Sequence, residues 1–245
     1  MTRRRWIADE VSGDRAALTG DHAAHLVRVL RAQVGQEFDI ACHSTVRQGR
    51  ITSLSDARVE FELGAEVLSS ALPEITLLLS IFKFDRMEWA IEKCVELGVV
   101  RIIPLIARRS AAHLVAAAAK RVDRWKRIAL QAAEQSRRTA PPSIGDPVKL
   151  SDVPKFNVTP ADPVGAPLRI VLSESGPHVP LRDLLGSTSG SQLVLTVGPE
   201  GGWTEDELQH FREAGWSSAS LGTTILRAET AAIAAIAIAM SELNP

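Results

Sequence analysis

Hydrophobic and polar positions alternate in short runs in the early part of the chain. From Phe38 to about Leu72 the runs are brief, as in Arg58–Leu63, and this pattern predicts a small β unit. Ahead of it, Asp21–Leu30 places apolar residues at helical spacing, which predicts a short helix with one buried face and one basic face. We assign residues 1–72 to one small domain.

After Pro73 the pattern changes to apolar runs that alternate with amphipathic stretches, which predicts an α/β domain with a mainly parallel sheet over residues 73–245. The stretch Thr139–Pro167 is rich in proline and is expected to be irregular. The expected strands are Ile75–Phe82, Val99–Ile106, Leu168–Leu172, Leu193–Val197 and Ala219–Leu221. The expected helices are Arg86–Leu97, which Gly98 ends, Arg121–Arg138 and a buried terminal helix around Ala231–Met240.

A glycine-rich turn, Gly198–Gly202, follows one of these strands and resembles a ligand-binding loop. Its three glycines allow positive φ and a close approach of the backbone to a ligand. Thr204 and Glu207 then predict a capping box at the start of a helix. The turn matches neither the phosphate-binding P-loop nor the dinucleotide pattern, and Glu200 would repel a pyrophosphate. A flat ligand with a cationic part fits better, although a plain strand–helix connection is the alternative.

Two further loops follow late strands, at Ser173–Gly176 and Gly222–Thr224. Because ligands lie beyond the carboxyl ends of the strands in open α/β sheets, we expect all three loops to meet in one pocket. Arg227 and Glu229 stand next to this pocket, before an apolar helix. Arg227 can face an anionic substrate and Glu229 the positive start of the helix. The alternative is an ordinary terminal charge pair.

The charge composition limits how this protein could bind nucleic acid. With 28 Lys and Arg against 29 Asp and Glu, the formal net charge of −1 excludes nucleic-acid binding by bulk charge alone. Basic residues are nevertheless bunched, which indicates local RNA-facing patches, with a solvated surface as the alternative. The candidates for RNA contact are Arg3, Arg4, Arg5, His25, Arg28 and Arg31.

The spacing of Cys42 and Cys94 indicates neither a disulfide framework nor a zinc site, so we expect two buried thiols in a reducing cytoplasm and no bound metal. Arg3–Arg5 has no apolar stretch behind it, so no signal peptide is predicted. The longest apolar tract, Ala231–Met240, is far shorter than the ~20 residues of a membrane span.

Several motifs in order along the chain resemble the ribosomal RNA small subunit methyltransferase E family of the SPOUT superfamily. They extend from His25 to Ala231. One departure is Thr224, where many members have an Arg. The motifs are His25 with Arg28–Arg31 and Gly35, Glu92-Lys93 with Glu96–Val99, Glu134–Arg138 with Pro141, Gly198–Gly202, and Leu221-Gly222 with Ile225–Ala231.

The resemblance implies a PUA-like RNA-binding β-barrel in residues 1–72 and a SPOUT methyltransferase domain with a C-terminal trefoil knot in residues 73–245, an exception to the rule that folds avoid knots. It also implies a homodimer, S-adenosylmethionine as cofactor and methylation of uridine N3 in 16S ribosomal RNA, free or in the assembled small subunit. The implied cofactor pocket comprises Leu172, Ser173, Thr196, Val197, Gly198, Pro199, Glu200, Gly201, Leu221, Gly222, Ile225 and Leu226.

The reaction requires removal of the N3 proton and stabilisation of the negative charge left on the uracil ring. We assign charge stabilisation to Arg227 and to Arg137 or Arg138, and Glu229 is a candidate base, with water as the alternative. Two other functions stay open at this point. One is a SPOUT enzyme that methylates another base or a ribose hydroxyl, and the other is a non-enzymatic RNA-binding protein.

Overall fold

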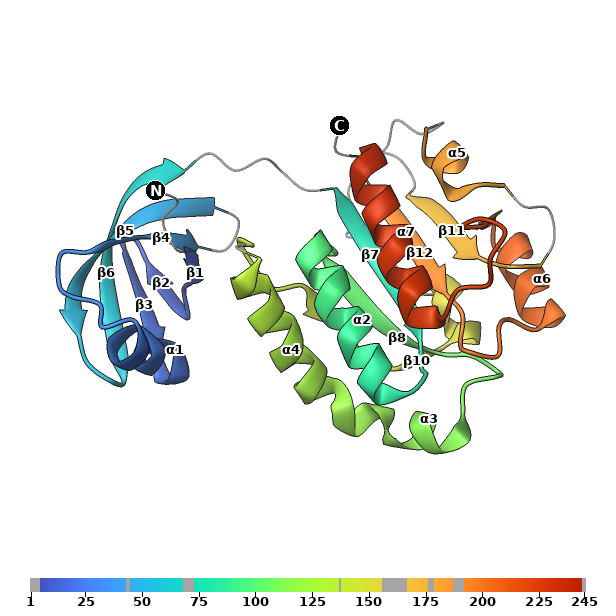
Figure 1. Ribbon diagram of the computed structural model, residues 1–245, viewed down its shortest axis with the longest axis horizontal. Coiled ribbons are helices and arrows are strands. Elements are labelled where there is room, and N and C mark those ends of the chain that lie inside the picture. Colours follow the sequence, from blue (N-terminus) through green and yellow to red (C-terminus); the bar gives the residue numbers. More distant parts are fainter. Residues whose placement is uncertain are drawn as a thin grey trace. The chain divides into compact units, whose positions relative to one another are not determined.

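The computed structural model describes residues 5–42, 45–67, 73–136, 138–155, 167–175, 179–186 and 192–243. The chain divides into two compact units (Figure 1). The first unit consists of Met1–Ala71 with Ala133–Pro141, and the second of Leu72–Ala132 with Pro142–Pro245.

The first unit is built on a six-stranded half-barrel with the strand order β1-β4-β5-β6-β3-β2. β1 and β4 are parallel, and the other neighbouring pairs are antiparallel. In β6, Val59, Phe61 and Leu63 are buried and alternate with polar residues, which is the alternation that predicted a small β unit. The elements are β1 (Arg5–Ile7), β2 (Glu10–Ser12), β3 (Arg15–Thr19), α1 (Gly20–Ala24), the π-helix η1 (His25–Val29), β4 (Glu37–Cys42), β5 (Thr45–Leu54) and β6 (Arg58–Val67).

The helix expected over Asp21–Leu30 is divided into the short α1 and the π-helix η1. A π-helix has a wider hydrogen-bond spacing than an α-helix, so its side chains fall in different directions from those expected at α-helical spacing. Ala23 and Leu26 are buried, but Val29, which was expected on the buried face, is 64% exposed. Of the four residues expected on the basic face, His25, Arg28 and Arg31 are exposed, whereas His22 is partly buried and pairs with Asp9 and Glu134.

The second unit contains a seven-stranded sheet in which every pair is parallel. Its order is β10-β8-β7-β12-β11-β13, and β9 pairs with β8. The strands are β7 (Glu74–Ser80), β8 (Arg101–Ile106), β9 (Ser143–Ile144), β10 (Val148–Lys149), β11 (Leu168–Leu172), β12 (Gln192–Val197) and β13 (Ser217–Ala219). The helices are α2 (Phe84–Leu97), α3 (Ala112–Ala118), α4 (Val122–Gln135), α5 (Leu181–Gly186), α6 (Glu205–Glu213) and α7 (Ala228–Leu243), with 3-10 turns η2 (Ala119–Arg121) and η3 (Leu150–Lys155).

Helical segments cover both faces of this sheet, which explains why its central strands are almost entirely buried and mainly apolar. α2 and α7 run side by side over one face (Figure 1). On the other face, Leu208 and Phe211 of α6 and Leu150 of η3 pack against Leu78 and Val194 of the central strands. An α/β fold with a parallel sheet was therefore predicted correctly from the pattern of apolar runs.

Some elements differ from the prediction. β13 lies two residues before the expected Ala219–Leu221, and the stretch expected to be irregular contains β9 and β10, each only two residues long. α2 ends as predicted, since Gly98 has a left-handed φ of 117° and its N–H bonds to the last turn of the helix.

Cys42 and Cys94 are free and buried, and burial raises the pKa of the Cys94 thiol to about 12. Both thiols therefore belong to the packed interior, as predicted. Within the described ranges, no helix is long and apolar enough to cross a bilayer. The same residues contain no group of three or more His, Cys, Asp or Glu side chains suited to a metal ion.

Candidate active site

Three loops lie together at the carboxyl edge of the parallel sheet. In the register of β11 with its neighbours, Val171 pairs with Thr196 of β12 and Leu172 with Ala219 of β13, so the three strands end at similar heights. The backbone N–H of Ser173 also donates to the carbonyl of Ala219 at 3.0 Å. The strand ends therefore bring the loops that follow β11, β12 and β13 to one edge, as expected from the sequence.

Hydrogen bonds fix the end of the Gly198–Gly202 loop that leads into α6. The predicted capping box is present: the Thr204 N–H donates to Glu207 Oε2 at 2.8 Å, and the Glu207 N–H donates to Thr204 Oγ1 at 3.3 Å. Trp203 Nε1 donates to the Leu172 carbonyl at 2.9 Å, which connects this loop to the end of β11. Of its three glycines, Gly202 uses the positive φ that glycine allows, with a value of 67°.

Arg108 and Arg109, which the sequence analysis did not assign to the site, hold this loop from the end of β8. Arg109 Nη1 donates to the carbonyls of Gly201 at 2.8 Å and Trp203 at 3.2 Å. The Arg108 N–H donates to Glu207 Oε1 at 2.8 Å. These contacts join segments more than 90 residues apart, so no local sequence signal indicates them.

The residues expected to hold the cofactor differ in how accessible they are. Leu172, Thr196, Val197 and Pro199 are buried, and the Thr196 hydroxyl donates to the Leu78 carbonyl at 3.3 Å, so this hydroxyl is a part of the sheet. Glu200, Gly201 and Gly222 are exposed, and Ile225 is 82% exposed. Gly198, Ser173, Leu221 and Leu226 are partly buried. The edge thus offers backbone groups and aliphatic side chains.

The two candidates for chemistry next to α7 differ in environment. Arg227 is exposed, and within the described part of the chain its side chain has no hydrogen bond or ion pair. Glu229 is only 4% exposed, and its Oε2 has no hydrogen-bond partner among the described residues. Arg86 of α2, which was not identified from the sequence, lies between Glu229 and Glu200.

The other two catalytic candidates, Arg137 and Arg138, come from the segment that follows α4. Arg137 lies outside the described residues. Arg138 belongs to the first unit, and burial lowers the pKa of its guanidinium to about 10, so it is still protonated at neutral pH. Glu134 of the same segment lies 2.9 Å from His22 Nε2, which connects the end of α4 to α1.

Of the residues expected to contact RNA, Arg3 and Arg4 lie outside the described residues. The His25 ring is exposed and packs with its centroid 5.8 Å from that of the buried Trp6. Arg28 Nη2 forms an ion pair with Asp56 at 2.7 Å, and Arg31 has a φ of 51°. Arg5 is partly buried in β1. The first unit therefore presents His25, Arg28 and Arg31 on its surface.

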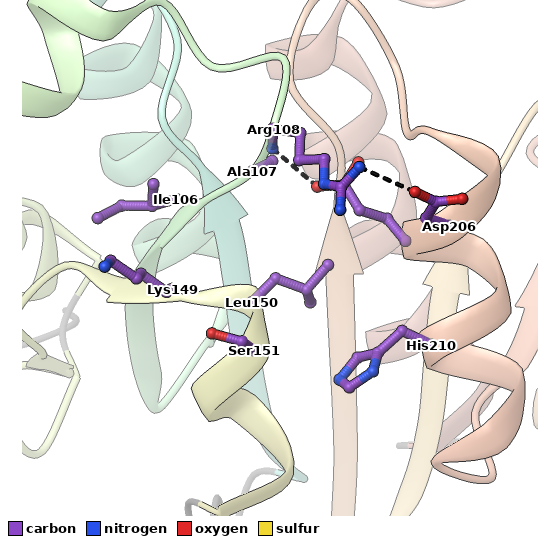
Figure 2. Close-up of a pocket in the computed structure, with 9 residues that line it drawn as sticks. Ile106, Ala107, Arg108, Lys149, Leu150, Ser151, Asp206 and His210 are labelled. Carbon is purple, nitrogen blue, oxygen red and sulfur yellow. Dashed lines mark hydrogen bonds and ion pairs between the residues drawn. The ribbon is translucent and has the colours of Figure 1, made fainter.

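A separate cavity of about 380 Å³ lies between the end of β8, η3 and α6 (Figure 2). Arg108 crosses its upper side and pairs with Asp206 at 2.8 Å, and His210 points toward η3 from α6. None of the expected cofactor residues lines this cavity. Its lining residues are Ile106, Ala107, Arg108, Lys149, Leu150, Ser151, Asp206, Glu207 and His210.

Comparison with known proteins gives the family. A family model described as an RNA methyltransferase domain matches residues 69–240. A ribosomal RNA small subunit methyltransferase E of Aquifex aeolicus is 29% identical over 96% of this chain and 97% of its own length. That of Bacillus subtilis is 30% identical over 90% and 87%. The chain belongs to the ribosomal RNA small subunit methyltransferase E family.

Solved structures with this fold include proteins bound to the cofactor. A methyltransferase E of Neisseria gonorrhoeae bound to S-adenosylmethionine is 31% identical, with a TM-score of 0.78 over 97% of this chain and 96% of that one. A putative methyltransferase of Legionella pneumophila in complex with the same cofactor is 26% identical, with a TM-score of 0.80 over 98% of each chain. The methyltransferase E fold thus extends over nearly the whole chain.

Proposed function

We propose that this chain is an S-adenosylmethionine-dependent methyltransferase that methylates N3 of a specific uridine in 16S ribosomal RNA. Family membership and the cofactor-bound relatives support the reaction class. The observation that carries the proposal in this chain is the convergence of three loops at one edge of the parallel sheet, beside Arg227 and Glu229. Ligands of open α/β sheets bind at this edge.

The residues at this edge fit the cofactor in two respects. The exposed backbone around Glu200 and Gly201 can pair with the polar rim of an adenine, and the aliphatic side chains of Ile225 and Leu226 can cover its faces. Glu200 places a carboxylate close to where a cationic ligand would lie. When bound, S-adenosylmethionine supplies a methyl group carried on a positively charged sulfur. The proposed cofactor residues remain Leu172, Ser173, Thr196–Gly201, Leu221, Gly222, Ile225 and Leu226, with Thr196 acting through its place in β12.

Arg227 and Glu229 are assigned complementary roles. Uridine N3 carries a proton at neutral pH, and Glu229 Oε2, buried and without a partner in the described residues, is a suitable acceptor for it. Loss of that proton leaves negative charge on the uracil oxygens. The exposed guanidinium of Arg227 can stabilise this charge by hydrogen bonds. Both groups are held beside the methyl donor, and this proximity contributes part of the rate enhancement.

The first unit is proposed to bind the RNA as a PUA-like domain. Its half-barrel presents the exposed side chains of His25, Arg28 and Arg31. Arginine binds phosphates strongly, and an exposed imidazole can stack on a base. Arg3, Arg4 and Arg5 are proposed to extend this surface. Arg137 and Arg138 are proposed to reach the methylation site, in the same subunit or in the partner subunit.

A homodimer is proposed on the basis of an apolar surface. α7 is hydrophobic all round, yet its Ile233 and Ile238 are only partly covered and Ala237 is exposed. Trp89 of the adjacent α2 is 48% exposed. Such a surface in water favours association with a second copy. We also propose that residues 73–245 contain a trefoil knot. The protein is proposed to act in the cytoplasm, where ribosomal subunits are available, without associating with a membrane.

The test uses bacterial cells that lack this protein. Ribosomal RNA from these cells, digested and analysed by mass spectrometry, should lack one N3-methyluridine, and the purified protein with S-adenosylmethionine should restore it on isolated small subunits. Loss of a ribose methylation or of a different base methylation would instead favour another SPOUT activity. An unchanged RNA together with no cofactor binding in calorimetry would reject the enzymatic function.

A further inference from the structure

Arg86 contacts two carboxylates that come from different parts of the proposed site. It lies in the first turn of α2, and its Nη1 donates to Glu200 Oε1 at 2.7 Å. Its Nε lies 3.8 Å from Glu229 Oε1. Glu200 belongs to the Gly198–Gly202 loop and Glu229 to the first turn of α7. One guanidinium therefore connects α2, this loop and α7.

The two contacts differ in their environment. The Glu229 side chain is 6% exposed, against 40% for Glu200 and 31% for Arg86. Charges attract more strongly when water is excluded, and a buried carboxylate without a cation nearby is costly. Among the described residues, Arg86 is the one cation within ion-pairing distance of Glu229. The 3.8 Å contact between Arg86 Nε and Glu229 Oε1 therefore stabilises the buried carboxylate more than a contact of the same length would at an exposed site.

Glu229 is also incompletely paired. One oxygen faces Arg86, while Oε2 is buried and has no hydrogen-bond partner among the described residues. Buried polar atoms in folded proteins are nearly always paired, and the exceptions often have a catalytic role or a partner that arrives with a ligand. An arginine that holds the first oxygen fixes the direction in which the second one points.

We propose that Arg86 is a positioning residue of the methyltransferase site, which holds the Glu200 side chain and orients the Glu229 carboxylate toward the substrate. This inference rests on the proposed function, in which Glu229 accepts the uridine proton. Arg86 then acts on two steps through two partners. Through Glu200 it sets the position of the cofactor loop and hence the affinity for S-adenosylmethionine. Through Glu229 it sets the rate of methyl transfer.

Arg86→Gln and Arg86→Lys, with Arg124→Gln as a matched control, test the proposal in the full-length protein. Arg124 lies in α4, and its Nε donates at 2.8 Å to Glu88, which belongs to α2 as Arg86 does. Arg124 contacts neither Glu200 nor Glu229. Calorimetry gives the Kd for S-adenosylmethionine, and methylation of small subunits gives kcat and KM. Thermal unfolding of each variant shows whether it is folded.

Arg86→Gln should weaken cofactor binding about 10-fold and lower kcat about 100-fold, magnitudes typical of lost charged hydrogen bonds in a site. Arg86→Lys should recover part of both losses, since an ammonium restores the charge but cannot donate in two directions with the same geometry. Arg124→Gln should match the wild type.

The outcomes separate this inference from the proposed function. If the wild type methylates small subunits and Arg86→Gln does so with unchanged kcat and Kd, the positioning role is overturned while the proposed function stands. The same conclusion follows if Arg86→Gln lowers only the unfolding temperature. If the wild type itself neither binds S-adenosylmethionine nor methylates RNA, the proposed function fails and this inference fails with it.

Discussion

The indole N–H of Trp203 donates to the carbonyl of Leu172 at 2.9 Å, and this bond joins the end of the Gly198–Gly202 loop to the last residue of β11. Trp203 is 8% exposed and also packs edge-on against Phe211, with ring centroids 5.1 Å apart. Gly198 permits this arrangement, because a Cβ there would lie 3.1 Å from the Trp203 ring. The position of the Gly198–Gly202 loop therefore depends on the buried Trp203.

Trp203→Phe should lower the free energy of unfolding by about 1–3 kcal/mol and weaken cofactor binding, because the hydrogen bond to Leu172 is lost. Denaturant unfolding and calorimetry measure the two effects. Trp216→Phe is the control, since Trp216 packs on the same Phe211 at 5.1 Å but does not bond to Leu172. Equal losses of cofactor affinity in both variants would contradict the role of this hydrogen bond.

Gly201→Val should disturb the loop through Arg109. A Cβ at Gly201 would lie 3.2 Å from the Arg109 Cβ, and Arg109 is the side chain that binds the Gly201 and Trp203 carbonyls. Calorimetry should show S-adenosylmethionine affinity reduced by about 10-fold or more, equivalent to ~1.4 kcal/mol. Gly202→Asn is the control, because asparagine tolerates a φ of 67° and a Cβ there meets nothing within 4 Å. Full affinity in Gly201→Val would argue against a cofactor site at this loop.

Arg227→Ala should leave S-adenosylmethionine binding nearly intact and reduce kcat by about 10²–10³-fold, the usual effect of removing a group that stabilises charge in the transition state. The Arg227 side chain is exposed, so its removal should not change the unfolding temperature. Single-turnover methylation of small subunits measures the rate. Arg212→Ala, on the surface of α6, should behave as the wild type, and an unchanged rate in Arg227→Ala would exclude Arg227 from the mechanism.

His22 should make stability depend on pH. A hydrogen bond to Glu134 and, in addition, the charge of Asp9 raise the pKa of His22 to about 9, above its ordinary value of 6.5. A pKa that is higher in the folded state stabilises the protein fully below about pH 6.5, and this contribution is lost as the pH rises through about 9. We expect about 1–2 kcal/mol, allowing for partial exposure of the ring.

Unfolding of the wild type and of His22→Gln at pH 6 and pH 9.5 measures this contribution, and the difference between the two proteins should be larger at pH 6. His113→Gln, which removes an exposed histidine, is the control. An NMR titration that found an unshifted pKa for His22 would contradict the prediction.

Local signals in the sequence predicted the parts of the site that depend on neighbouring residues. The end of α2 at Gly98 and the capping box of Thr204 and Glu207 were both predicted, since each involves residues within one helical turn. The parallel sheet was predicted because strands covered on both faces are apolar throughout.

Contacts between distant segments could not be predicted in this way. Arg86 and Glu200 are 114 residues apart, and Arg109 and Gly201 are 92 apart. The strands β1 and β2 are three residues long and are too short to show a period. The inclusion of Ala133–Pro141 in the first unit likewise depends on tertiary contacts at the end of α4, such as that between Glu134 and His22.

The small side chains of α7 make the position of Glu229 sensitive to substitutions in the core. Its fully buried positions are mostly alanines, including Ala232, Ala235 and Ala239, so the backbone of this helix approaches its neighbours closely. A larger residue at any of them would displace α7 from the elements that it packs against, and Glu229 in its first turn would move with it. Core substitutions some turns away from Glu229 can therefore misplace this proposed base by fractions of an ångström without removing any atom of the proposed site.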